Sequence, residues 1–115
     1  MLRAVVLTAL AALFASTTSA MSIRELRALE VSDKKQGEAY ANYYLVGVME
    51  GALEAHTHAV RNGTKPGICI NGRRLQPSMA RSMFDTELKR NEGVYEADMP
   101  VQLVLINALA TVYPC

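Results

Sequence analysis

Apolar residues recur every three or four positions along most of the chain, which is the spacing of one face of an α-helix. The longest such stretch, residues 37–60, contains no proline and includes Tyr40, Tyr43 and Tyr44. Because only one stripe of a helix faces a core, three tyrosines within five residues cannot all be buried. The pattern predicts one long helix with at least one tyrosine on the surface.

Three shorter segments have the same helical spacing. Ser22 and Glu25 form the Ser-x-x-Glu pattern of a capping box, which predicts a short helix that ends at the polar stretch 31–35. A helix is expected from about Pro77 to Arg90, with proline in the first turn, where it is tolerated. The segment Val101 to Val112 is almost entirely apolar, so we expect this last helix to be the central element of the core.

Loop-forming residues separate these segments. Residues 61–67 contain asparagine, glycine and proline, and residues 68–70 are expected to run in an extended form to a turn at Asn71-Gly72. No repeat and no linker divides the chain. The pattern predicts an all-α fold, a small bundle of about four helices.

The first 20 residues have the composition of a bacterial secretory signal peptide. Arg3 precedes an apolar run, residues 4–15, and small residues at 17–20 predict cleavage after Ala20. The alternative is a membrane anchor, but a span needs about 20 apolar residues, more than this run provides. We therefore expect a periplasmic protein whose mature domain is residues 21–115.

The chain has two cysteines, Cys69 and Cys115. In an oxidising compartment such as the periplasm, two cysteines of a small domain generally form a disulfide. This bond would tie the C-terminus to the mid-chain loop and contribute about 4 kcal/mol by restricting the unfolded chain. Two free thiols, one buried and one at the tail, are the alternative.

The charge balance argues against one class of partner. Arg3 is the only charged residue among residues 1–20, so the mature domain would carry 11 basic and 11 acidic residues. Nucleic-acid binding generally requires a net positive surface. The sequence therefore predicts no nucleic-acid partner.

The histidines and carboxylates offer little for catalysis or metal binding. His56 and His58 lie two residues apart, so on a helix they point about 200° from one another and cannot share an ion. Glu50, Glu54 and His58 recur every four residues, which is typical of a solvated helix face, with a catalytic constellation as the alternative. No activated nucleophile motif is present. We therefore expect no catalytic, metal or cofactor site, and a protein that is not an enzyme.

Two features point to helix contacts. Gly47 and Gly51 form a G-x-x-x-G pattern, which in a soluble bundle lets another helix approach closely. The tyrosines and the largely apolar last helix exceed what one small domain covers comfortably. From the tyrosines and the last helix we expect a homodimer.

The residues from about Tyr43 to Cys115 resemble the Rap and Tai immunity proteins, which protect bacteria from amidase toxins of type VI secretion systems. The resemblance rests on Tyr44, Gly47 and Gly51, on Gly67-Ile68-Cys69, on Ala108-Leu109, and on the closing Tyr113-Pro114-Cys115. It implies a small all-helical periplasmic fold with a Cys69 to Cys115 disulfide. It also implies frequent homodimerisation and a secreted cell-wall amidase as the partner, which the protein inhibits by blocking the active-site groove.

The loop at residues 91–97 is the candidate for the inhibitory element, because it is long for so small a bundle. It offers Glu92, Tyr95 and Glu96 on a turn that contains a glycine, and acidic groups there would suit the imidazole of a cysteine-histidine amidase. A solvated connection without function is the alternative.

Two other functional classes remain open. A small periplasmic chaperone of the acid-stress type has a similar size, helical content and disulfide. A small hydrolase would require Glu50, Glu54 and His58 to converge in a concave site.

Overall fold

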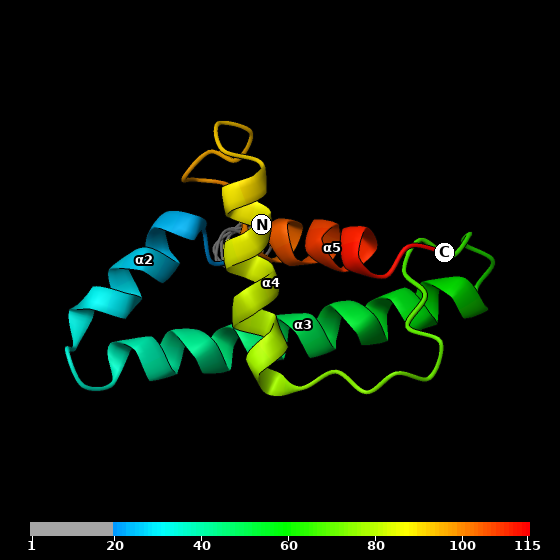
Figure 1. Cartoon of the computed structure of the whole chain (residues 1–115), viewed down its shortest axis with the longest axis horizontal. Coiled ribbons are helices and arrows are strands. Elements are labelled where there is room, and N and C mark those ends of the chain that lie inside the picture. The colour runs from blue at the N-terminus through cyan, green and yellow to red at the C-terminus, as the bar shows by residue number, and fades with distance from the viewer. Residues whose placement is uncertain (1–19) are drawn as a thin grey trace, which may run out of the picture.

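The computed structural model describes residues 20–115, and within this range it has four helices and no strand, with one disulfide (Figure 1). The predicted all-α fold is therefore confirmed. The expected signal peptide falls on residues that lie outside the described range, apart from Ala20. Residues 21–115 contain all four helices, α2 to α5.

The helix α2, Ile23–Ser32, begins at the predicted capping box. The Ser22 hydroxyl accepts a hydrogen bond from the Glu25 N–H at 3.1 Å, and a Glu25 carboxylate oxygen accepts one from the Ser22 N–H at 3.4 Å. The helix runs to Ser32, two residues into the polar stretch at which we expected it to end. The Ser32 hydroxyl donates to the Leu29 carbonyl at 2.7 Å.

The long helix α3, Gly37–Arg61, follows α2 after a short turn, and the two helices pack against each other. Gly37 is buried at this contact. A Cβ atom at position 37 would lie 2.6 Å from the Leu29 carbonyl oxygen and 2.5 Å from that of Glu30. Only glycine therefore allows the end of α2 to lie this close to the start of α3.

The helices α4, Pro77–Arg90, and α5, Val101–Val112, have the predicted bounds. In Figure 1, α4 crosses α3, and α5 runs from behind α4 toward the C-terminus. The last helix packs against both α3 and α4 and contributes more buried residues than any other described helix, whereas α3 packs against all three of the others. Its buried side chains are Val101, Val104, Leu105, Ala108 and Leu109.

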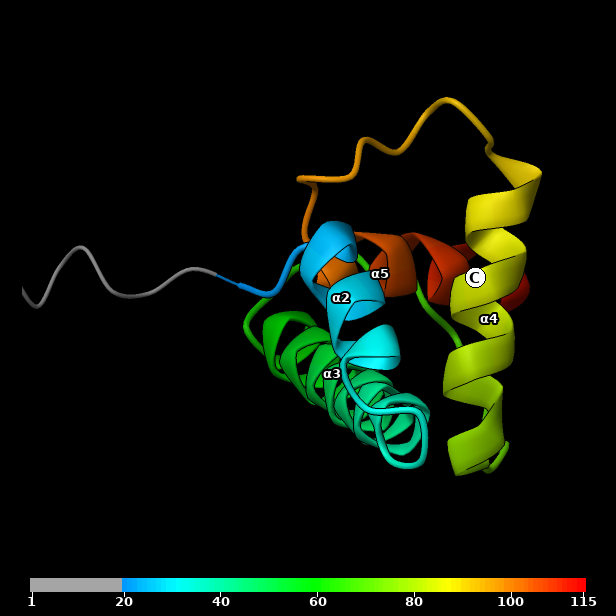
Figure 2. The ribbon, with the colours of Figure 1, turned by 90° about the vertical axis from the view of Figure 1, so that its left-hand side faces the viewer.

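The start of the described chain pairs with the segment before α5. Ser22 forms an isolated antiparallel bridge with Pro100, the Ile23 N–H donates to the Met99 carbonyl at 3.0 Å, and the Val101 N–H donates to the Met21 carbonyl at 2.9 Å. This backbone contact holds the start of α2 beside the start of α5 (Figure 2).

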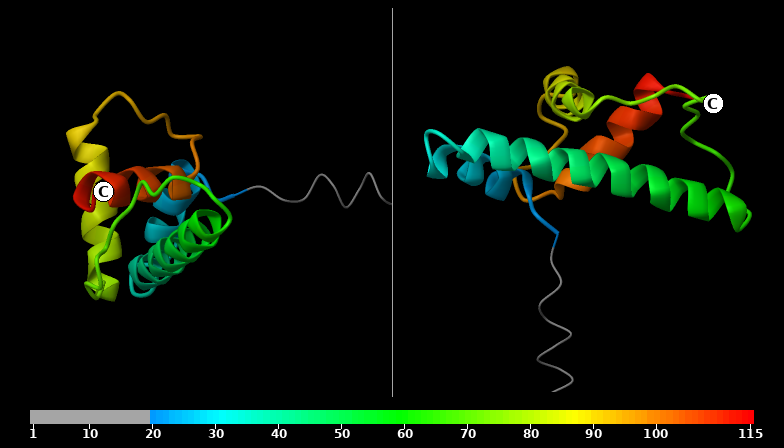
Figure 3. Two further views of the ribbon diagram at one scale, coloured as in Figure 1. Left: turned by 90° about the vertical axis from the view of Figure 1, so that its right-hand side faces the viewer. Right: turned by 90° about the horizontal axis from the view of Figure 1, so that it is seen from below.

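The C-terminus is fixed to the loop between α3 and α4, which runs along the outside of the bundle (Figure 3). Cys69 and Cys115 form a disulfide, as predicted, with 46 residues of sequence separation. Beside it, the Cys69 N–H donates to the Tyr113 carbonyl at 2.8 Å, and the Arg73 guanidinium lies 5.2 Å from the centroid of the Tyr113 ring. A disulfide, a backbone hydrogen bond and a cation–π contact therefore all hold the C-terminus against this loop.

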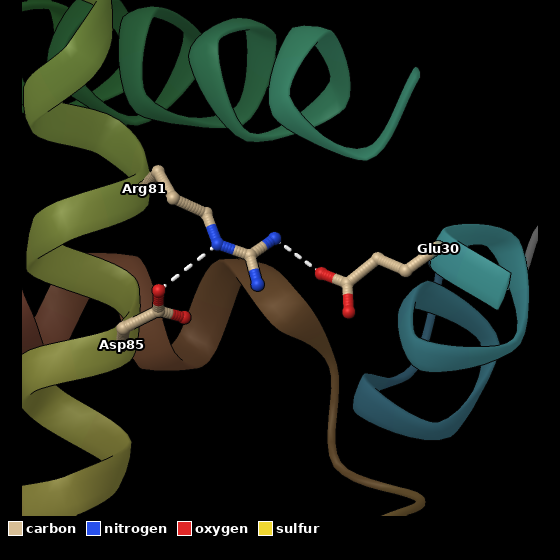
Figure 4. A network of polar contacts seen from close by, with 3 residues as sticks. All are labelled: Glu30, Arg81 and Asp85. Atoms are coloured by element: carbon tan, nitrogen blue, oxygen red, sulfur yellow. Dashed lines mark hydrogen bonds and ion pairs between the residues drawn. The ribbon is translucent and has the colours of Figure 1, made fainter. Parts of the chain in front are cut away.

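An ion-pair network connects α4 with α2 (Figure 4). In Figure 1, α2 and the C-terminus lie on different sides of α4. The Arg81 guanidinium binds the Glu30 carboxylate through one terminal nitrogen, and its Nε lies 3.0 Å from an Asp85 carboxylate oxygen. The Arg81 and Glu30 side chains are half-buried, so this pair is somewhat less screened by solvent than a fully exposed surface pair.

Candidate functional site

The segment between α4 and α5, residues 91–100, arches away from the helices (Figure 2). We call this segment the anchored loop. Internal turns hold it: the Val94 N–H donates to the Asn91 carbonyl and the Met99 N–H to the Glu96 carbonyl, both at 3.0 Å. Gly93 has a φ of 83°, which favours glycine at that turn.

A buried carboxylate fastens the anchored loop to the bundle. Glu87, on α4, is only 5% exposed. Its Oε1 accepts hydrogen bonds from the Tyr95 hydroxyl and from Nδ2 of Asn91, each at 3.0 Å. Nδ2 of Asn107, on α5, donates to the Tyr95 hydroxyl oxygen at 2.9 Å. This Glu87 network joins α4, the anchored loop and α5.

The environment of Tyr95 changes its acidity. Burial disfavours the charged phenolate and raises the pKa of Tyr95, and the bond to Glu87 raises it further, whereas the bond from Asn107 acts in the opposite direction. The net pKa of the phenol lies above its ordinary value. Tyr95 therefore remains a hydrogen-bond donor to Glu87 at all ordinary pH values.

The three residues predicted to bind a partner take different positions in the anchored loop. Glu92 and Glu96 are exposed, as is Val94 between them, at 63%. Tyr95 is half-buried and its hydroxyl is engaged in the Glu87 network. The loop therefore presents its carboxylates and Val94 outward, while Tyr95 holds it in place.

A pocket of about 250 Å³ lies between α4 and α5, directly beside this network. Its walls are mostly apolar, formed by Met79, Met83, Ala108, Val112 and Tyr113. The polar side chains that line it all come from α4: Ser82, Thr86, Glu87 and Arg90.

The carboxylate of Glu87 is only half used by the protein. Its Oε2 is buried and has no hydrogen-bond partner among residues 20–115. A buried carboxylate oxygen without a partner costs free energy, and a water molecule, an ion or a ligand group can complete its bonding. Among residues 20–115, Oδ1 of Asn42 and Oε1 of Gln102 are also buried without a partner. Glu87 is thus both the anchor of the loop and part of the pocket wall.

The histidines serve separate purposes on α3. Nε2 of His56 accepts hydrogen bonds from the backbone N–H groups of Gly67 and Ile68, at 3.1 and 3.2 Å, and so positions the segment before Cys69. His58 is exposed beside Asn62. Within the described residues, no three histidine, cysteine or acidic side chains come together as metal ligands do.

The possible hydrolase constellation lies on an exposed surface. Glu50, Glu54 and His58 are all exposed along α3. Their arrangement along one helix does not provide the concave polar site that the hydrolase alternative requires.

The G-x-x-x-G interpretation is wrong for contacts within the described part of the chain. A Cβ atom added at Gly47 or Gly51 would meet nothing within 4 Å. Gly51 instead lines a shallow apolar pocket of about 290 Å³ between α3 and α5, together with Ala55 and Ile106. Two of the three tyrosines are also exposed, Tyr40 at 51% and Tyr43 at 77%, as the pattern predicted.

Sequence reasoning missed Glu87, Asn107 and His56 as organising residues. A signal existed for Glu87, since it follows Met83 and Phe84 by four and three positions and thus shares their apolar face. A charged residue on a core-facing stripe generally has bound partners. For Asn107 and His56 the partners are distant in sequence, and no local pattern indicates them.

None of the helices in the range 20–115 combines the length and apolar character that a membrane-spanning segment needs. Comparison of the chain with protein-family models, with curated proteins and with solved structures finds no match.

Proposed function

We propose that this chain is a periplasmic immunity protein, which binds a secreted peptidoglycan amidase of a type VI secretion system and blocks its active-site groove. It acts by occupying the groove and turns over no substrate. The target, the compartment and the mode of action rest on the resemblance in residues 43–115 and on the signal-like composition of residues 1–20.

The anchored loop is the observation that carries the proposal. A plug for an enzyme groove must protrude and must also be rigid, because ordering a mobile loop on binding reduces affinity. The loop arches away from the bundle (Figure 2), and the buried Glu87 network fixes its base. Glu92, Val94 and Glu96 are then free to contact a partner.

Self-association through a different surface fits the same proposal. The pocket beside Gly51, Ala55 and Ile106 is apolar and open, and Leu103 and Ile106 on α5 are 38% and 42% exposed. Small residues on α3 let a helix of a second copy approach closely. The proposed dimer uses this face and leaves the anchored loop accessible.

Co-expression tests the proposal in cells. Bacteria that export the cognate amidase are expected to survive with the wild-type protein and to lyse without it. The double variant Glu92→Lys, Glu96→Lys reverses the loop's charge and is expected to lose protection. Glu54→Lys, an equally exposed reversal on α3, is the matched control and is expected to protect. Equal lysis with and without the wild-type protein would contradict the proposal and would favour the chaperone alternative.

A further inference from the structure

We propose that the pocket between α4 and α5 binds a primary ammonium group on an aliphatic stem, with the Glu87 carboxylate as its counter-ion. This site is distinct from the exposed face of the anchored loop. It rests on the geometry of the pocket, and only the origin of the ammonium group depends on the proposed function.

The carboxylate supplies the first part of the argument. Glu87 is 5% exposed and lines the pocket, and Oε2 has no hydrogen-bond partner within residues 20–115. Both ion pairs of the described residues involve Arg81, and neither reaches Glu87. A buried carboxylate without a cation is unfavourable, so a cationic ligand that reaches Oε2 gains more there than at the surface.

The arrangement of the two oxygens selects the kind of cation. A guanidinium binds best as a fork, through both carboxylate oxygens. Here Oε1 already accepts hydrogen bonds from Asn91 and Tyr95, and only Oε2 is free. A single acceptor suits an ammonium group, which is a compact donor and needs no planar pair of oxygens.

The remaining polar groups of the pocket match the ammonium group's other protons. An ammonium has three N–H donors, and one of them would bind Oε2 of Glu87. Ser82 and Thr86 also line the pocket, and their hydroxyls are possible acceptors for the others. Metal ions are less well served, because calcium requires six to eight oxygen ligands.

The apolar walls match the stem. Met79, Met83, Ala108 and Val112 line the pocket, and lysine-like chains bury their methylene groups against such surfaces. At about 250 Å³ the pocket is smaller than those that hold drug-sized ligands or cofactors, and it suits one side chain. Because Oε2 is nearly inaccessible to solvent, an ammonium group reaches it only if neighbouring side chains shift. Two residues of the lining are methionines, whose unbranched side chains adapt readily.

Arg90 is the one competing cation that lines the pocket. It lies three residues after Glu87 on α4, is exposed, and makes no ion pair with Glu87. Its charge repels an incoming ammonium group from the mouth of the pocket. Removal of this charge is therefore expected to strengthen binding, the opposite of the effect at Glu87.

The probe is n-butylamine, which carries the four-carbon stem and ammonium group of lysine. Titration into the ¹⁵N-labelled mature protein is expected to give saturable shifts of backbone amide signals within residues 79–90 and 108–113. n-Butanol, which has the same stem and no charge, is expected to bind at least about tenfold more weakly, as for the loss of one charged hydrogen bond.

Matched variants test whether the charge of Glu87 is responsible for butylamine binding. Glu87→Gln keeps an acceptor for Tyr95 and Asn91 but removes the charge, and it is expected to weaken butylamine binding about tenfold. Glu54→Gln removes a charge from the exposed face of α3 and is expected to leave butylamine binding unchanged. Arg90→Gln is expected to tighten it. Absence of saturable shifts in the wild-type protein, or equal binding by Glu87→Gln with its fold intact by circular dichroism, would overturn the proposal.

A second arm identifies the source of the ammonium group. If it is a lysine of the proposed amidase partner, butylamine is expected to compete with complex formation, and Glu87→Gln to weaken the complex. If a free amine occupies the pocket, the complex forms equally well with butylamine bound. The arm with isolated protein needs no amidase, so failure of the immunity function leaves the test of the pocket intact.

Discussion

The hydroxyl of Tyr95 donates a hydrogen bond to Oε1 of Glu87 across 3.0 Å, and this one contact joins the loop before α5 to the buried face of α4. It places an acidic side chain inside the bundle as the base of a protruding segment. Glu87 also lines the neighbouring pocket, and its other carboxylate oxygen is buried without a hydrogen-bond partner among residues 20–115.

The Tyr95 contact predicts a stability change at alkaline pH. The pKa of Tyr95 is raised in the folded protein. Its contribution to the free energy of unfolding is therefore complete below about pH 10, where an unfolded tyrosine begins to ionise. As the pH rises further, the unfolded state loses this proton first, and the free energy of unfolding falls.

Tyr95→Phe removes this dependence and costs about 1 kcal/mol at neutral pH through the lost hydrogen bonds. Urea unfolding of the two proteins from about pH 8 to about 11 measures both effects. Tyr43→Phe, at an exposed position, is the control and is expected to follow the wild-type curve. A difference between wild type and Tyr95→Phe that does not change with pH would contradict this role for Tyr95.

Gly37 and Gly47 provide a paired prediction on α3. Gly37→Ala is expected to lower the free energy of unfolding by about 1 to 3 kcal/mol, because its Cβ would collide with the carbonyl oxygens of Leu29 and Glu30. Gly47→Ala meets nothing within 4 Å and is expected to raise it by about 0.5 to 1 kcal/mol through higher helix propensity. Chemical denaturation measures both, and equal effects at the two positions would refute the close contact of α2 with α3.

The helices and the disulfide could be predicted because their signals are local or few. Proline at 77, the apolar run 101–112 and the capping box at Ser22 each specify one element, and two cysteines allow one pairing. The Glu87 network and the pairing of Ser22 with Pro100 depend on how separate helices meet, which no short pattern records. The glycines illustrate this limit of sequence patterns. Gly47 and Gly51 form a recognisable G-x-x-x-G pattern but have open space beside them, whereas Gly37, which belongs to no such pattern, makes the close helix contact.

The disulfide between Cys69 and Cys115 is expected to be a major source of stability. Cys115→Ser should lower the free energy of unfolding by about 2 to 4 kcal/mol, since it frees a long loop in the unfolded chain. Thermal unfolding measures the loss, and reduced wild-type protein serves as the control that should match the variant. An unchanged melting temperature would show that the remaining contacts of Tyr113 suffice.

The exposed face of α5 predicts the oligomeric state. The mature protein is expected to sediment as a dimer at micromolar concentration, and Ile106→Glu is expected to make it monomeric by placing a charge in the apolar pocket beside Gly51. Val31→Glu, at an 80% exposed position near the end of α2, is the control and should remain dimeric. A wild-type monomer would eliminate this interface.

The measurement that tests the central claim most directly is a titration of amidase activity with the purified mature protein. Release of peptide fragments from peptidoglycan by the proposed amidase partner is expected to fall to zero at a defined stoichiometry. The Glu92→Lys, Glu96→Lys variant, folded by circular dichroism, should require a higher concentration for the same inhibition, and Glu54→Lys should not. Undiminished amidase activity with the wild-type protein in large molar excess would contradict the immunity function.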